Sequence, residues 1–286
     1  PDSSGGALFV WQPQTQSGEP DGKGPIMAQR ISPDGHNSWQ SEGAPVVGIG
    51  RIRFLDDAVA DGSGGAIVTW LETEGGLSAP GTVWGQRLDH NGNRLWGDNG
   101  RPVFGSPGAP PETTMPESST RQTVTTTISN VSVSSTYQTV LKDDGAGSAL
   151  LLVAGLPLRA QMIGASGDVV WIGGGVPVWQ GSAQAFRIAS FGLDGSIVVW
   201  SQTFGLTQAQ RLDGSGNGLW EAGGVAVTTD KNVNFFNIIA EDGGNGGTLV
   251  AWGEGKDVYN IQQSYIQRLD AQGNRLWGNN GIRLDK

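Results

Sequence analysis

"QRLDHNGNRLWGDNGRPV" occupies Gln86 to Val103, and "QRLDAQGNRLWGNNGIRL" repeats it almost unchanged from Gln267 to Leu284. Both stretches read Gln, five residues, Gly, three residues, Trp, three residues, Gly, and this spacing occurs in five copies. The fixed residues are Gln29, Gly35 and Trp39; Gln86, Gly92 and Trp96; Gln161, Gly167 and Trp171; Gln210, Gly216 and Trp220; and Gln267, Gly273 and Trp277. Such a repeat indicates a fold built from copies of one supersecondary unit.

One further segment accompanies each copy, and a second accompanies four of them. One is "GGAIVTW" ending at Trp70 or "DGSIVVW" ending at Trp200, with Val153 in place of Trp in the third copy. Four copies have another segment before it, such as "RFLDDAVAD". These segments are short, β-branched or aromatic, and bounded by Gly, Asp and Ser, which indicates strands joined by hairpins. Four antiparallel strands per unit, which we name A to D in chain order, predict an all-β, five-bladed β-propeller.

The repeat positions also set the expected boundaries. We expect one domain over 1–286, with blades at 1–50, 51–104, 137–182, 183–231 and 232–286, and a tolerated surface insertion at 105–136. The first blade contains strands B to D only, because Asp2 aligns with Asp61 in the turn between strands A and B. Residues before Pro1 or a partner chain are expected to supply the missing strand, unless the chain belongs to a longer array.

Each repeated residue has an expected structural role. The Gly before each Trp suits a turn that needs a positive φ, and Asp89, Asp213 and Asp270 can bond turn amides. The Trp can lie between neighbouring blades, and the Gln can bond backbone groups that a strand edge leaves unpaired. A binding site rarely needs five equivalents of every member, so we interpret the repeat as a scaffold.

Composition excludes several functions. The net charge is −9 with only 16% charged residues, so no basic stripe is present for nucleic acid. No apolar run approaches the ~20 residues of a membrane helix, and the absence of cysteine excludes disulfides and thiol chemistry. The composition suits a bacterial protein that is extracellular, on the cell surface or periplasmic.

The combination "DGSGGAIVTW … GQRLDHNGNRLWG" resembles the repeat of uncharacterised secreted or surface β-propeller proteins of bacteria. Its core, Asp89, Gly92 and Trp96, is also similar to the Asp-box turn and to the tryptophan-docking motif of quinoprotein propellers. The resemblance implies a propeller fold and an exported location, and it implies little about activity.

Candidates for chemistry are few. The two histidines, His36 and His90, lie in equivalent turns of separate blades and do not converge, so we expect neither a metal site nor a cofactor. Trp84 and Trp179 stand outside the repeat and are the candidate aromatics of a lectin-like sugar site. A propeller glycosidase would place carboxylates on the innermost strands. The candidates there are Asp56, Asp57, Asp144 and Glu241, of which only Asp56 and Asp57 are expected well inside a strand.

We therefore predict a noncatalytic binding or scaffold module that contacts another protein or a subunit of a larger assembly. The B–C loops, which vary most, and the 105–136 insertion are the expected contact elements. A carbohydrate-binding, lectin-like propeller is the alternative, and a glycoside hydrolase is less favoured.

Overall fold

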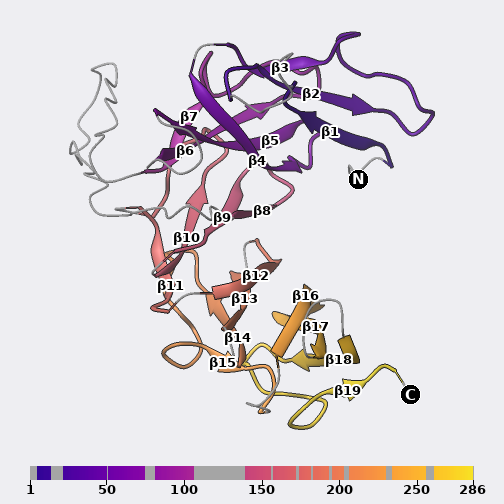
Figure 1. The fold of residues 1–286 in the computed structure, drawn as a ribbon, viewed down its shortest axis with the longest axis vertical. Helices are drawn as coiled ribbons and strands as arrows, with labels where there is room; N and C mark the ends of the chain where they lie inside the picture. Colours follow the sequence, from indigo (N-terminus) through magenta and orange to yellow (C-terminus); the bar gives the residue numbers. More distant parts are fainter. Residues whose placement is uncertain are drawn as a thin grey trace. The chain divides into compact units, whose positions relative to one another are not determined.

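The computed structural model describes residues 5–13, 22–49, 51–74, 81–105, 139–155, 157–171, 174–181, 183–192, 195–202, 206–229, 234–255 and 261–285. Nearly all of the 105–136 insertion and most of the variable B–C loops lie outside these residues. The described part of the chain contains nineteen strands and no helix (Figure 1). No helix in this part could span a membrane.

The strands form five antiparallel sheets, in each of which consecutive strands are neighbours. The first sheet comprises β1 (Ala7–Trp11), β2 (Ile26–Ile31) and β3 (Ala44–Val47). The second comprises β4 (Ile52–Ala60), β5 (Ala66–Thr73), β6 (Gly81–Leu88) and β7 (Arg101–Phe104). The third comprises β8 (Thr139–Asp143), β9 (Ala149–Val153), β10 (Leu158–Ile163) and β11 (Val176–Trp179).

The fourth sheet comprises β12 (Ala183–Ser190), β13 (Ser196–Gln202), β14 (Thr207–Leu212) and β15 (Val225–Ala226). The fifth comprises β16 (Asn234–Gly244), β17 (Gly247–Gly255), β18 (Ile261–Leu269) and β19 (Ile282–Arg283). Each sheet falls within one predicted blade. The predicted fold, an all-β, five-bladed propeller, is confirmed, and the first sheet has three strands within the described residues.

The chain divides into two compact units. Unit 1 comprises Pro1–Tyr137, Gly145–Ser148 and Gln161–Gly175, and unit 2 comprises Gln138–Asp144, Ala149–Ala160 and Val176–Lys286. Unit 1 thus holds the first two blades with the C–D hairpin of the third. Unit 2 holds the remaining strands of the third blade and the last two blades.

The hydrophobic core lies between neighbouring blades in each unit. In unit 1, Ala28 and Val46 of the first blade join Val68 and Trp70 of the second in one buried cluster. In unit 2, Val199 of the fourth blade and Trp252 of the fifth belong to a corresponding cluster. Strand B is buried on both faces in the second, third and fourth blades, apart from the last residue of β13, and Trp70 and Trp200 are fully buried. Alternating apolar side chains on both faces of strand B therefore stabilise the contact between blades.

The repeated Gln closes the C–D hairpin of its own blade. In all five copies its Oε1 accepts the backbone N–H of the repeated Trp at 2.8–3.2 Å. Its Nε2 donates to a backbone carbonyl of the same hairpin at 2.6–3.1 Å. One side chain thus satisfies a donor and an acceptor that the short strand D leaves without a partner.

The repeated Trp contacts the following blade. The indole N–H donates at 3.0 Å from Trp39 to the carbonyl of His90, from Trp96 to that of Ala165, and from Trp220 to that of Ala271. Trp39 and Trp96 are nearly buried, at 7% and 2% exposed. The indole therefore combines apolar burial with a satisfied polar group.

Candidate functional site

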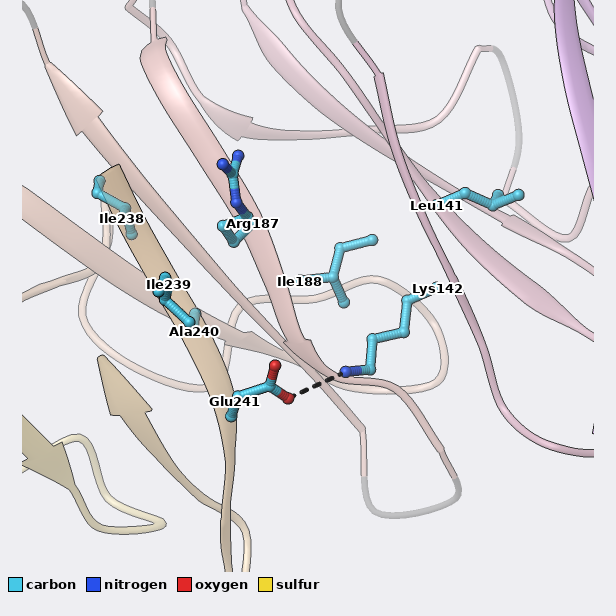
Figure 2. Close-up of a pocket in the computed structure, with 8 residues that line it drawn as sticks. All are labelled: Leu141, Lys142, Arg187, Ile188, Ile238, Ile239, Ala240 and Glu241. Atoms are coloured by element: carbon cyan, nitrogen blue, oxygen red, sulfur yellow. Dashed lines mark ion pairs between the residues drawn. The ribbon is translucent and has the colours of Figure 1, made fainter. Parts of the chain in front are cut away.

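A hollow of about 450 Å³ opens in unit 2 between the first strands of three successive blades, β8, β12 and β16 (Figure 2). Its volume lies within the ~300–1,000 Å³ range of small-molecule sites. The lining residues are Leu141, Lys142, Arg187, Ile188, Ile238, Ile239, Ala240 and Glu241. Adjacent strands bring them together, because β12 contacts both β8 and β16.

Strand alternation decides which side chains reach the hollow. Successive side chains of a strand point to opposite faces, and Leu141, Ile188 and Ala240 are buried, at 5%, 4% and 5% exposed. These three residues occupy equivalent positions, since they pair with Leu151, Val198 and Val250 of strand B. Their neighbours on the opposite face therefore form two levels. Arg187 and Ile239 stand at one level, and Lys142 and Glu241 stand at the next.

One end of the hollow carries an ion pair. Lys142 Nζ lies 3.7 Å from Glu241 Oε2, and Figure 2 shows the two side chains pointing toward one another from β8 and β16. The lysine side chain is 34% exposed and the glutamate side chain 68%. A pair this exposed contributes little to stability, so both groups are available to a ligand.

The other end carries the guanidinium of Arg187. Its Nη1 donates to the backbone carbonyl of Phe186 at 2.8 Å, and the residue is exposed. The guanidinium points away from the Lys142–Glu241 pair (Figure 2). The 59%-exposed side chain of Ile239 adds an apolar surface to the hollow.

The lining combines donors, one acceptor and apolar carbons. Ammonium and guanidinium groups donate, a carboxylate accepts, and isoleucine offers dispersion contact. Hydrolysis of a glycosidic bond by the usual route needs two carboxyl groups that flank the bond. Among the described lining residues Glu241 is the single carboxylate, so the hollow supplies one of the two groups.

Of the four predicted carboxylates, Glu241 is the one that lines the hollow. Asp56 and Asp57 lie in β4 of unit 1, beside a register shift between Leu55 and Asp57. Asp56 Oδ2 accepts from the Thr69 hydroxyl at 3.3 Å, and Asp57 Oδ1 accepts from the Ala58 N–H at 2.8 Å. Asp144 follows the end of β8.

The two candidate aromatics are packed against other side chains. Trp179 stacks on Trp200 with ring centroids 6.1 Å apart. Trp84 is partly buried against the core cluster of unit 1 and pairs in register with Trp70. The geometry does not present either ring as an open stacking platform.

The two histidines belong to unit 1. His36 Nε2 is 3.7 Å from Asp34, with both side chains exposed, and the backbone carbonyl of His90 is bonded to the Trp39 indole. Within the described ranges no three His, Cys, Asp or Glu side chains group closely enough to hold a metal ion.

The sequence-based prediction of site residues did not include Lys142 and Arg187. A signal was present, since each stands next to a buried aliphatic residue in a strand A, in "TVLKD" and "AFRIAS". A charged residue at an alternating position of a first strand is the pattern that marks both residues.

No protein-family model and no curated protein matches the sequence. The resemblance to uncharacterised bacterial propeller repeats thus stays a prediction.

Solved structures do resemble the chain. A levansucrase from Bacillus subtilis is 8% identical, with a TM-score of 0.44 and coverage of 97% of this chain and 83% of that one. An α-L-arabinofuranosidase from Fusarium graminearum is 10% identical, with a TM-score of 0.40 and coverage of 80% and 68%. Prolyl oligopeptidase B from Galerina marginata is 11% identical, with a TM-score of 0.47 and coverage of 98% and 34%. This chain therefore spans about a third of that peptidase, and at these identities the likeness concerns the fold alone.

Two predictions need correction. The chain was expected to be a noncatalytic protein-binding or scaffold module and not an enzyme. Both predictions are wrong, because carbohydrate-active enzymes predominate among the similar solved structures. The physical reason lies in the first strands of the blades. Glu241 was not expected well inside a strand, whereas it stands inside β16 and lines an open hollow with two cationic side chains.

Proposed function

We propose that the protein binds a saccharide in the hollow between β8, β12 and β16. The observation that carries the proposal is the lining of this hollow, in which three charged side chains surround the exposed Ile239. A sugar ring presents hydroxyl groups around its edge and C–H groups on its faces. The hydroxyls need both donors and acceptors, which Lys142 and Glu241 offer together, and the C–H groups need an apolar contact, which Ile239 offers.

A titration tests this proposal. Isothermal calorimetry against a panel of neutral and acidic oligosaccharides is expected to detect binding to at least one of them. Glu241→Gln removes the charged acceptor and is expected to weaken that binding about tenfold, the usual effect of losing a charged hydrogen bond. Glu221→Gln is the matched control, because it makes the same change at an exposed residue outside the hollow and should bind like the wild type. Absence of binding across the panel would contradict the proposal.

A second candidate function is hydrolysis of the bound sugar with Glu241 as an acid–base or nucleophilic group. The observation that favours it is the position of Glu241, an exposed carboxylate within a strand and beside the Lys142 ammonium. Release of reducing ends from the oligosaccharides that bind would measure turnover. Loss of turnover in Glu241→Gln, with turnover retained in Glu221→Gln, is the expected result. Equal turnover in both variants would remove Glu241 from the mechanism.

A further inference from the structure

We infer that the hollow selects a saccharide that carries a carboxylate, a uronic acid, and that Arg187 binds this group. The inference rests on the proposed function and names the class of sugar. It begins from the charge of the lining. Lys142 and Glu241 neutralise each other in their ion pair, so the guanidinium of Arg187 is left as the unbalanced charge among the described lining residues. The charge of this site is opposite in sign to the net charge of the chain, which is −9.

The hydrogen bonding of Arg187 leaves its guanidinium able to bind an anion. One of its five N–H groups donates to the carbonyl of Phe186, which belongs to the same strand. No carboxylate in the described part of the chain forms an ion pair with it. The planar fork of a guanidinium matches the two oxygens of a carboxylate, and such bidentate pairs are stronger than neutral hydrogen bonds. Arg187 therefore has the chemistry to recognise a carboxylate.

The spacing of the two polar ends fits an oligosaccharide. Arg187 and the Lys142–Glu241 pair stand at successive levels of the strands, two residues apart and thus about 7 Å along the strand direction. The guanidinium of Arg187 points away from the pair (Figure 2), so the two charged ends lie farther apart than their strand positions. Ile239 stands at the Arg187 level and can contact the carbons of a sugar ring. A uronic acid oligosaccharide with its carboxylate at Arg187 thus offers the hydroxyls of a neighbouring unit to the Lys142–Glu241 pair.

The experiment compares matched sugars. Wild-type protein is titrated at low ionic strength with glucose, galactose and mannose oligosaccharides, with the corresponding uronic acid oligosaccharides, and with sulfated oligosaccharides of the same length. Low ionic strength is needed because salt screens exposed charges. In at least one pair the uronic acid is expected to bind about tenfold more tightly than the neutral sugar.

Variants assign the preference to Arg187. Arg187→Gln is expected to bind the uronic and neutral sugars of that pair equally, within about twofold, whereas Arg187→Lys should retain part of the preference because it keeps the charge without the fork. Arg283→Gln is the control, since it removes the same charge from an exposed residue of unit 2 that is paired with Asp285. It should keep the full preference. Thermal unfolding of each variant checks that the fold is intact.

The outcomes separate the two proposals. Failure of wild-type protein to bind any sugar would overturn the proposed function and this inference with it. Equal binding of neutral and uronic sugars would overturn the inference alone, and so would an unchanged preference in Arg187→Gln. Sulfated sugars that bind as tightly as uronic acids would show recognition of negative charge in general and would also overturn the carboxylate assignment.

Discussion

The indole ring of Trp96 lies directly over Gly167 of the next repeat, so that a Cβ added to this glycine would come within 2.7 Å of the ring. The same relationship joins Trp39 to Gly92 at 3.1 Å and Trp220 to Gly273 at 3.0 Å. The Trp and the Gly of the repeat thus form one contact shared by successive copies. Their constant spacing follows, because each hairpin must present a ring to one neighbour and a bare backbone to the other.

Gly167→Ala is expected to lower the free energy of unfolding by about 2–5 kcal/mol. The loss has two causes: alanine is strained at a left-handed φ, and its Cβ overpacks against Trp96. Gly97→Ala is the matched control, because Gly97 has almost the same φ, +82° against +84°, and no atom lies within 4 Å of its added Cβ. It should cost only the backbone share of about 1–2 kcal/mol. Urea unfolding of both variants measures the difference, and equal losses would contradict the packing role of Trp96.

Gln86→Leu is expected to release the C–D hairpin of the second blade. The buried Gln86 accepts the Trp96 N–H at 2.8 Å and donates to the carbonyl of Gly97 at 2.6 Å. Leucine leaves the Trp96 N–H and the Gly97 carbonyl without this partner, and each unsatisfied buried group is expected to lower the free energy of unfolding by about 1–3 kcal/mol. Hydrogen exchange should accelerate at the Trp96 amide and remain slow at the Leu95 amide, which bonds to the carbonyl of Arg87. Unchanged protection of Trp96 would contradict this role.

The fold could be predicted from the sequence because the repeated residues act through local geometry. Gln86 reaches its own hairpin, so its spacing from Trp96 is set by the hairpin itself. The Arg that follows this Gln was overlooked, although Arg87 and Arg211 both donate to carbonyls of the next C–D turn, those of Ala165 and Ala271. The "QR" pair in four of the five copies was the available signal.

The candidate site was only partly predictable. Glu241 was named because a propeller glycosidase places acids on first strands, but Lys142 and Arg187 were not. These three residues are far apart in the sequence, and they converge through the packing of β8, β12 and β16. Convergence of this kind leaves no local motif, since each strand contributes one or two residues whose neighbours are ordinary core aliphatics.

The buried ion pair of the second blade gives a further prediction. Arg53 Nε donates to Glu72 Oε2 at 2.9 Å, and both side chains are less than 10% exposed. Glu72→Leu leaves the Arg53 guanidinium buried without a carboxylate and should cost about 3–5 kcal/mol. The double variant Arg53→Met with Glu72→Leu should recover most of this loss, because an apolar pair needs no desolvated charge. Urea unfolding measures the stability of both variants. A double variant as unstable as Glu72→Leu alone would contradict this account of the ion pair.

Asp61 predicts a pH dependence of stability. Burial raises its pKa, but hydrogen bonds from Ser63, Arg87 and Gly65 outweigh burial and hold the pKa below its ordinary value. A pKa lowered by folding means that the unfolded chain binds more protons, so this stabilisation is present above the unfolded pKa of about 3.9 and is lost as the pH falls through the folded value. Asp61→Asn should therefore be less stable than the wild type at pH 7, by about 1–3 kcal/mol.

The difference between the wild type and Asp61→Asn should shrink as the pH falls below about 4, since the Asp61 carboxylate of the unfolded wild-type chain then takes up a proton while the folded chain still holds it ionised. Urea unfolding of both proteins at pH 7, 5 and 3 measures it. Asp98→Asn is the control, because Asp98 is 92% exposed and 3.6 Å from Arg94, and such a surface pair contributes little at any pH. If the deficit of Asp61→Asn were the same at all three pH values, the variant would be acting through packing and not through the charge that Arg87 compensates at 2.8 Å.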